Sequence, residues 1–322
     1  MTEAEISEGG PHPEERATLP RETWRTRYPE LARFARSYVA VASLLAIIAL
    51  ILLAIFGPML WPYEPNEMDP VLIGSPQPPS LKHPAGTDYL GRDMFARLLV
   101  GARISLAVGV VSMLITLFIG VSIGSAAAWF GGWVDSVLMR LVDALYSIPL
   151  LLIVIILQVF LKPNLQAMIP PGTDVPLLLS PDMASIYIAL GFANWLTMAR
   201  LSRAEVMNQR KKDYVSATVA LGAKPRRTLF RHILPNTVGP LMVAATLAIP
   251  EAIFIESFLA FIGIGVSAPE ASWGTLASDA VKSLGTSPHL LLFPALAISI
   301  TMLAFNLFGD GLRDALDPRG KK

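Results

Sequence analysis

The chain has 322 residues, of which 53% are hydrophobic and 16% are charged, so it is too apolar for an ordinary soluble domain and is predicted to be a membrane protein. Its net charge of +1 says little about partners, because the distribution of charge along the chain carries that information. The absence of cysteine excludes a disulfide framework, a thiolate zinc site and a cysteine nucleophile.

Residues 1–36 form a basic segment that contains six arginines. A short interfacial helix that starts at Pro29 would turn Leu31 and Phe34 towards the bilayer and its arginines towards the lipid headgroups. A solvated basic tail is the alternative. The apolar run that begins at Ser37 lies too late in the chain and is too long for a cleavable signal peptide, so we expect it to be retained as the first span.

Six runs of the chain are long and apolar enough to cross a bilayer, which takes about 20 residues of helix. They are Ser37 to about Leu60, about Arg103 to Phe130, about Ala144 to Leu161, Met183 to Ala199, Val238 to about Val266, and His289 to Phe308. The sequence therefore predicts an all-α polytopic membrane protein, with a six-helix transmembrane domain over residues 37–315 and a cytoplasmic tail over residues 316–322.

The connection between the first two predicted spans, residues 61–103, is dense in proline and glycine, as in WPYEPNEMDP and SPQPPSLKHPAGTD. Such composition indicates irregular structure outside the membrane. Five charged residues at its end are expected to form an ion-pair network that braces the loop against the second span: Asp88, Arg92, Asp93, Arg97 and Arg103. A contact with a substrate or a binding protein is the alternative.

Two smaller features follow in the chain. Gly120 and Gly124 form a pattern of small residues four apart, which favours close helix packing but is common by chance. Residues 131–143 are expected to form a short inner turn, in which Asp135, Arg140 and Asp143 have a structural role.

A polar stretch, DYVSATVALGAKPRRTLFRHILPN, occupies residues 213–236 between two apolar runs. We expect a helix from Arg200 to Leu221, a left-handed corner at Gly222, and a second helix that begins at Pro225. Pro235 would end or kink that helix. Its apolar side would carry Leu229, Phe230, Ile233 and Leu234, and a bent amphipathic element of this kind suits docking into a groove on another protein.

The fifth predicted span contains two acids, Glu251 and Glu256, which a bilayer tolerates only when they face water or another helix. Five residues of helix separate them by about 140°, so they cannot share one narrow face. One could line a pore while the other contacts a partner subunit. The alternative is that both are structural hydrogen-bond partners. Pro250 is expected to interrupt the helix beside them.

The distribution of lysine and arginine predicts the orientation of the chain. With the N-terminus inside, the inner segments hold twenty basic residues and the outer segments hold six. Both termini and the loop of residues 200–237 are therefore expected in the cytoplasm.

Residues 213–236 resemble the cytoplasmic signature loop of ABC importer permeases, in which Glu-Ala-Ala, a glycine and a Leu-Pro pair recur at fixed spacing. Ala217, Gly222 and the Leu234-Pro235 pair match that pattern, whereas three positions depart from it: Ser216 for glutamate, Thr218 for alanine and His232 for isoleucine. Four blocks, one of them within this loop, resemble the shorter permease of the dipeptide, oligopeptide and nickel branch: GTDYLGRDMFARLLVGARISL (86–106), FGGWVDSVLMRLVDALYSIPLL (130–151), RHILPN (231–236), and ESFLAFIGIGV with SWG (256–266, 272–274).

The resemblance implies a permease that forms half of a translocation pore for peptides or a related small solute in the bacterial cytoplasmic membrane. It implies a second homologous permease, two ATPase subunits that use ATP and magnesium, and an extracytoplasmic substrate-binding protein, and no nucleic acid. The residues implied to couple to the ATPase are Ser216, Ala217, Leu221, Gly222, Ala223, Arg226, Arg227, Leu234 and Pro235. Candidates for the translocation path or gate are Glu251, Glu256 and Trp273, the last being otherwise an interfacial anchor.

The chain itself lacks the motifs of an ATPase or a metalloenzyme. It contains no G-x-x-x-x-G-K-[ST] loop and no H-E-x-x-H motif. Its four histidines lie far apart in sequence, so neither a bound cofactor nor a metal site is expected.

Two other classes of protein remain open. An ion-coupled secondary transporter could use Glu251 and Glu256 as proton sites. A membrane scaffold or receptor could use the basic inner loop only to bind a partner.

Overall fold

The computed structural model describes residues 29–170, 172, 173 and 175–316. The expectations for residues 1–28 and 317–322 lie outside this part of the chain. The described residues form helices and no strand, in the order α2 (Pro29–Phe34), α3 (Tyr38–Leu60), α4 (Met94–Phe130), α5 (Gly132–Tyr146), α6 (Leu150–Ala167), η2 (Leu177–Leu179), α7 (Pro181–Arg210), α8 (Asp213–Ala220), α9 (Pro225–Arg227), η3 (Thr228–Ile233), α10 (Leu234–Phe261), α11 (Trp273–Val281) and α12 (His289–Leu316).

Five of these helices are long and apolar enough to cross a membrane: α3, α4, α6, the continuous helix Pro225–Phe261, and α12. The fourth expected span, α7, is longer than most of them at 30 residues but less apolar. Its polar residues are accommodated because the helix packs against α4, α6 and α10, which bury much of its surface. An all-α membrane fold with about six spans is thus confirmed.

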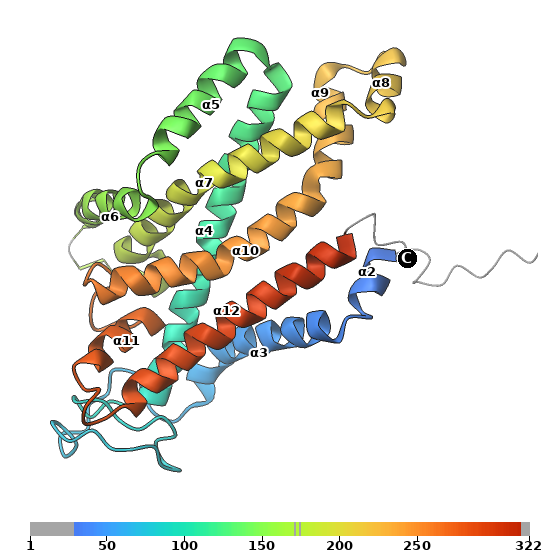
Figure 1. Cartoon of the computed structure of the whole chain (residues 1–322). Coiled ribbons are helices and arrows are strands. Elements are labelled where there is room, and N and C mark those ends of the chain that lie inside the picture. The colour runs from blue at the N-terminus through green and yellow to red at the C-terminus, as the bar shows by residue number, and fades with distance from the viewer. Residues whose placement is uncertain (1–28, 171, 174, 317–322) are drawn as a thin grey trace, which may run out of the picture.

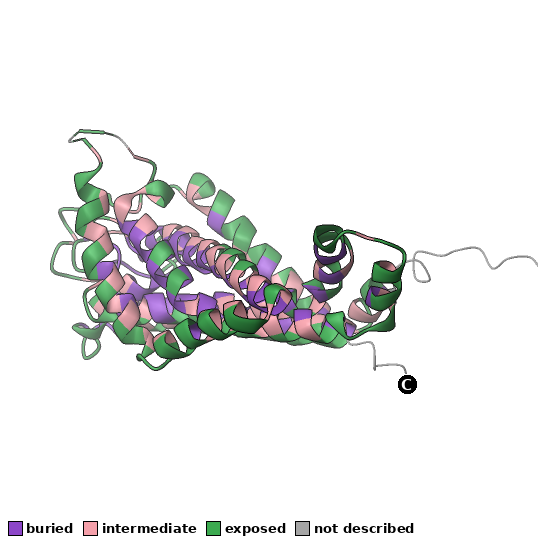
Figure 2. Ribbon diagram, turned by 90° about the horizontal axis from the view of Figure 1, so that it is seen from above, coloured by how far each residue is buried: buried purple, intermediate pink, exposed green. Residues whose placement is uncertain are grey.

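Figure 1 shows that the long helices run between two ends of the molecule. Residues 61–93 and α11 lie at one end, and α8, α9 and α2 lie at the other. Buried residues concentrate where the long helices face one another, while α8 and α9 project from the bundle (Figure 2). The elements predicted to face opposite sides of the membrane are therefore at opposite ends of the fold.

Several predicted boundaries were wrong. The second span begins at Met94 and not near Arg103, because the Asp93 side chain caps the helix by accepting a hydrogen bond from the Ala96 amide at 2.6 Å. The third span is Leu150–Ala167, six residues later than expected at both ends. The fifth and sixth spans are Leu234–Phe261 and His289–Leu316. The fifth continues through Pro250, which does not break it.

The expected turn at residues 131–143 is instead the helix α5, Gly132–Tyr146. Gly131 has φ +66°, a left-handed corner that ends α4 and lets a new helix begin at once. Two ion pairs tie α5 to α7: Arg203 to Asp135, at 2.5 and 2.6 Å, and Arg200 to Asp143, at 2.6 Å. Two of the three charged residues predicted to be structural therefore join helices.

The short helix predicted at Pro29 is present as α2. Leu31 is 60% exposed, and its orientation towards lipid stays a prediction. Phe34 differs from expectation, because its ring packs edge-on against Phe308 of α12 at 5.7 Å between centroids. This aromatic contact places α2 beside the end of α12.

Close packing of α4 on α7 depends on the two predicted glycines. A Cβ added to Gly120 would lie 2.5 Å from the Met198 Cβ, and one added to Gly124 would overlap the Ala199 carbonyl. The pattern of small residues therefore marks a real helix contact in this chain.

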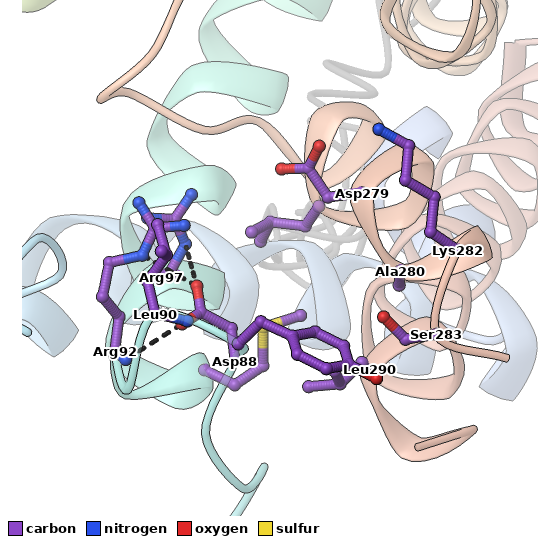
Figure 3. Close-up of a pocket in the computed structure, with 12 residues that line it drawn as sticks. Asp88, Leu90, Arg92, Arg97, Asp279, Ala280, Lys282, Ser283 and Leu290 are labelled. Atoms are coloured by element: carbon purple, nitrogen blue, oxygen red, sulfur yellow. Dashed lines mark hydrogen bonds and ion pairs between the residues drawn. The ribbon is translucent and has the colours of Figure 1, made fainter. Parts of the chain in front are cut away.

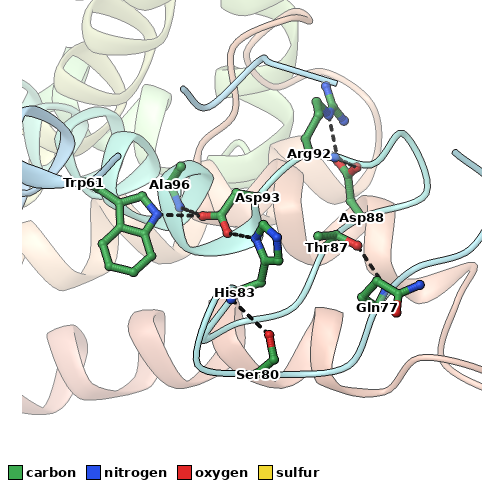
Figure 4. Close-up of polar contacts among 9 residues, drawn as sticks. All are labelled: Trp61, Gln77, Ser80, His83, Thr87, Asp88, Arg92, Asp93 and Ala96. Carbon is green, nitrogen blue, oxygen red and sulfur yellow. Dashed lines mark hydrogen bonds and ion pairs between the residues drawn. The ribbon is translucent and has the colours of Figure 1, made fainter. Parts of the chain in front are cut away.

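The charged residues of the outer loop divide into separate groups and do not form one network. Asp88 pairs with Arg92 at 2.7 Å and approaches Arg97 at 3.9 Å. Asp93 instead accepts hydrogen bonds from the indole of Trp61 at 3.0 Å and pairs with His83 at 2.7 Å (Figure 4). The loop is held to the start of α4 by these short polar contacts.

Arg103 stands apart from the acids, contrary to expectation. Its guanidinium donates to the carbonyls of Ala54 and Ile55 in α3, at 2.5 and 2.6 Å. Pro58 lies inside α3 and has no N–H, so the Ala54 carbonyl lacks its helical partner. Arg103 supplies a replacement donor at a membrane depth where an unsatisfied carbonyl would be costly.

Candidate functional site: the connector

The connector, residues 213–236, links α7 to α10 and projects from one end of the bundle (Figure 1). The helix expected from Arg200 to Leu221 is two helices, because α7 ends at Arg210 and α8 begins at Asp213. Lys211 and Lys212 form the break between them. The connector is therefore a separate unit and not a straight extension of α7.

A left-handed corner at Gly222 turns the chain, as the sequence predicted. Gly222 has φ +79°, and no atom lies within 4 Å of the position that a Cβ would take. The Gly222 amide donates to the Val219 carbonyl at 2.9 Å, and the Ala223 amide to the Thr218 carbonyl at 3.2 Å. These bonds satisfy carbonyls at the end of α8, so the corner is fixed by backbone conformation alone.

Beyond the corner, Pro225 occupies the first turn of a helix that continues into α10 without a break. Residues Thr228–Ile233 form a π-helical turn, in which the Leu234 amide bonds to the Leu229 carbonyl. Pro235 has no amide hydrogen and would clash with the carbonyl one α-turn earlier, and the wider turn accommodates it. Pro235 therefore neither ends the helix nor separates the connector from the span.

A small hydrophobic core seats the connector on the bundle. Ile233 is fully buried, and it packs with Leu229 from the π turn, Val215 from α8, Val206 from α7 and Ala128 from α4. Phe230 was predicted on this side but is 60% exposed, because the wider turn rotates it outwards. This core joins the connector to the ends of α4 and α7.

Polar contacts strengthen this seat. Gln209 donates to the Asn236 carbonyl at 3.1 Å and accepts from the Tyr214 hydroxyl at 3.0 Å. Burial raises the pKa of Tyr214, so its hydroxyl stays protonated and available as a donor. Arg210 donates to the last carbonyls of α4, those of Ala128 and Trp129. Sequence patterns gave no sign of these contacts, since their partners lie far apart in the chain.

The outer face of the connector is apolar at its centre and basic at its edge. Leu221 is 89% exposed and Val219 is 58% exposed, although both are large hydrophobic residues. Lys224, Arg226, Arg227 and Phe230 line a shallow hollow of about 420 Å³ beside them. An apolar patch rimmed by charge is typical of a protein-binding surface.

The nine residues predicted to couple lie together on this unit. Seven of them are exposed and two are half-buried, the exposed ones being Ser216, Ala217, Leu221, Gly222, Arg226, Arg227 and Pro235, and the half-buried ones Ala223 and Leu234. The side chain of Ser216, which replaces the family glutamate, makes no hydrogen bond with a residue in the described part of the chain. A serine at this position therefore contributes no side-chain contact to the described part of the chain.

Of the path candidates, Glu256 and Trp273 are buried between helices. The Glu256 carboxylate accepts a hydrogen bond from Ser272 at 2.6 Å, and Ser272 also caps α11. Trp273 is 2% exposed and donates its indole hydrogen to the Leu98 carbonyl at 3.0 Å. Both residues hold α11 against the bundle, and a role for them in a gate stays a prediction.

Glu251 lies on the opposite side of α10 and is exposed. Phe254 and Phe258 are exposed on the same helix. The two acids are thus separated as their spacing predicted. One face of α10 thus exposes an acid and two large aromatic side chains.

The sequence profile of the family described as "Binding-protein-dependent transport system inner membrane component" matches residues 118–322. A second profile, "N-terminal TM domain of oligopeptide transport permease C", matches residues 19–79. The first covers the connector and most of the helices around it.

Characterised relatives align with most of the chain. The "Oligopeptide transport system permease protein OppC" of Bacillus subtilis is 44% identical over 292 residues, which is 91% of this chain and 89% of that protein. The "Dipeptide transport system permease protein DppC" of the same organism is 42% identical over 289 residues, covering 89% and 84%. The "Glutathione transport system permease protein GsiD" of Pectobacterium atrosepticum is 36% identical, covering 94% and 91%.

Among solved structures, a chain of the inward-facing MetNI methionine ABC transporter superposes with a TM-score of 0.53 at 20% identity, covering 70% of this chain and 98% of that one. This likeness concerns the fold alone. Together, the two profile matches and the extent of the relatives assign the chain: it belongs to the family of binding-protein-dependent transport system inner membrane components.

Proposed function

We propose that this chain is a pore-forming permease subunit of an ATP-driven importer for dipeptides, oligopeptides or a related small solute. The connector carries the proposal, because its core packs onto the ends of α4 and α7 while Val219 and Leu221 stay exposed on its outer face. The named functions of the relatives, which include oligopeptide and dipeptide transport systems, support the choice of solute.

The proposal includes partners and an orientation. An ATPase subunit would bind the exposed face of the connector, and would supply the ATP and magnesium site, since this chain has no phosphate-binding loop. A second permease would complete the pore, and an extracytoplasmic binding protein would deliver the solute. The bias of basic residues supports cytoplasmic termini and a cytoplasmic connector in the bacterial inner membrane.

An apolar groove of about 720 Å³ between α4 and α10 supports the proposal that a second permease binds this chain. Its lining includes Leu117, Phe118, Leu241 and Met242, and it reaches the connector at Pro235. A surface of this size and apolarity suits contact with a helix of another subunit. Because the groove reaches Pro235, that helix would lie next to the connector.

The test is the substitution Gly222→Val in the complete transporter, reconstituted in proteoliposomes. Valine at φ +79° costs about 1–2 kcal/mol in backbone strain, so the corner is expected to adopt other conformations. ATP-driven uptake of a labelled tripeptide should fall, while the amount of inserted protein stays unchanged. Gly74→Val is the matched control, because Gly74 has φ +78°, also has no neighbour within 4 Å of a Cβ, and lies in the outer loop.

Normal uptake in Gly222→Val would contradict the docking role of the connector. The same vesicles separate the rival classes. Uptake that persists without ATP and collapses with the ion gradient would favour a secondary transporter that uses Glu251 and Glu256. A membrane scaffold would give no uptake under either condition.

A further inference from the structure

A cavity of about 620 Å³ opens between the outer loop and the helices α11 and α12. Asp88, Arg92 and Arg97 stand on one side of it, and Asp279, Lys282 and Ser283 on the other (Figure 3). The volume falls in the range of small-molecule sites, about 300–1,000 Å³. Neither the connector nor the acids of α10 contribute to this cavity.

Arg97 is a buried cation whose hydrogen-bonding capacity is not used. Its side chain is 4% exposed, yet Nε and Nη1 have no hydrogen-bond partner. Its nearest acid is Asp88, at 3.9 Å, which is too far for a hydrogen bond. The Asp88 carboxylate is already engaged by the side chain and amide of Arg92 and by the amide of Leu90. Buried guanidinium groups are normally paired, so the unused donors indicate a missing acceptor.

The opposite wall carries charges that are also unused. Asp279 is exposed into the cavity and makes no hydrogen bond or ion pair with a described residue, although it lies within electrostatic range of Arg97. Lys282 likewise has no such partner in the described chain. Figure 3 shows the Asp279 carboxylate and the Arg97 guanidinium on facing sides of the space. The lining therefore holds three cations and two carboxylates, one of which is committed to Arg92.

We propose that this cavity is a binding site for a small zwitterion of the dipeptide type, with the carboxylate of the ligand on Arg97 and its ammonium group on Asp279. The planar guanidinium can bind a carboxylate through two parallel hydrogen bonds. Arg97 is buried whereas Asp279 is exposed to solvent, so the contact of the ligand carboxylate with Arg97 is expected to be the stronger one. The choice of a peptide rests on the proposed function, whereas the pairing of a carboxylate with Arg97 rests on the geometry alone.

Isothermal titration calorimetry on the full chain in lipid nanodiscs tests the site with three probes. L-alanyl-L-alanine carries both charges, its C-terminal amide lacks the carboxylate, and its N-acetyl derivative lacks the ammonium group. Loss of one charge-assisted contact is worth about a tenfold to hundredfold change in affinity. We expect the amide to bind that much more weakly than alanylalanine, and the acetyl derivative to bind more weakly by a smaller factor.

Variants assign these contacts to residues. Arg97→Met should abolish the preference for the free carboxylate, and Asp279→Asn should abolish the preference for the free ammonium group. Arg140→Met is the control, because Arg140 is exposed on α5 and lies outside the cavity. If Arg97→Met does not fold, the affinities of the three probes for the unmodified chain still test whether the ligand carboxylate is recognised. Asp279 is exposed, so we expect the chain to fold with Asp279→Asn.

Equal affinity for alanylalanine and its amide would overturn the proposal, as would full binding to Arg97→Met or no saturable binding of any probe. The proposed function has a separate readout. If the transporter takes up solute with ATP but its permease binds no probe, the proposed binding site is rejected and the proposed importer function is kept. If the probes bind but uptake with ATP is absent, the importer function is rejected and the binding site is kept.

Discussion

Ile233 offers a direct test of how the connector is held. Its side chain is fully buried among Val206, Val215 and Leu229. Phe230 belongs to the same π-helical turn but is 60% exposed. Truncation to alanine at Ile233 removes buried core contacts of the connector, whereas truncation at Phe230 changes only its exposed surface.

The expected magnitude follows from the burial of Ile233. Replacing a buried isoleucine by alanine costs about 2–5 kcal/mol, because transfer energy is lost and a cavity is left. At the lower bound, the fraction of molecules with an undocked connector rises about thirtyfold, since each 1.4 kcal/mol is a factor of ten. The long helices keep their own packing, so the loss is expected to fall on the connector.

Limited digestion with trypsin measures this opening at Arg226 and Arg227, which are exposed but helical. At low trypsin concentration the cleavage rate follows the population of the open form. Ile233→Ala should be cut about thirtyfold faster at these sites, and Phe230→Ala at the rate of the unmodified chain. Equal rates for the two variants would refute the idea that the buried core holds the connector. The thermal unfolding midpoint of each variant checks that the bundle remains folded.

Three further predictions concern contacts elsewhere in the fold. Arg103→Met should destabilise the chain by about 1.5–3 kcal/mol and lower its thermal midpoint, because two carbonyls of α3 lose a charged donor, whereas Arg103→Lys should recover part of the loss. Glu256→Leu should lower the midpoint more than Glu256→Gln, which keeps an acceptor for Ser272; equal midpoints would contradict the importance of that bond. The hydrogen bond from Arg203 lowers the pKa of Asp135, so the pair stabilises α5 above the ordinary carboxyl pKa and is lost as the pH falls through the lowered value. Spin labels on α5 and α7 should therefore keep their separation at about pH 4, the ordinary carboxyl pKa, and move apart only at a lower pH. A separation that stays constant on further acidification would show that this ion pair does not hold α5 to α7.

Local chemistry was sufficient to predict the connector where the chain itself sets the conformation. Gly222 has the left-handed φ that its position between two helical stretches indicated, and Pro225 opens the next helix. The helix propensity of the surrounding residues also predicted α8, although not its separation from α7 at Lys211. Such features depend on a few neighbouring residues, so they can be read without knowledge of the packing.

Predictions failed where a distant or competing contact decides the conformation. The outward turn of Phe230 depends on how the helix accommodates Pro235, which apolar periodicity does not record. The helix α5 was predicted as a turn, because a glycine such as Gly131 can end a helix whether a loop or another helix follows it. Arg103 was assigned to nearby acids, but its acceptors are carbonyls of another span. Arg97 could be recognised as unpaired only after the position of Asp88 was known.

The helix α4 connects the two sites that the structure defines. Its 37 residues extend over about 55 Å, which exceeds the hydrocarbon thickness of about 30 Å, so the helix is longer than the bilayer core. Arg97 lies near its first turn in the outer cavity, and Ala128 lies near its last turn in the core beneath the connector. Along the intervening length, Gly120 and Gly124 bring α4 against α7 with no room for a methyl group. Close-packed helices move as units and deform little, so we expect α4 to move as one rod if the connector moves, with the outer cavity at the far end of that rod.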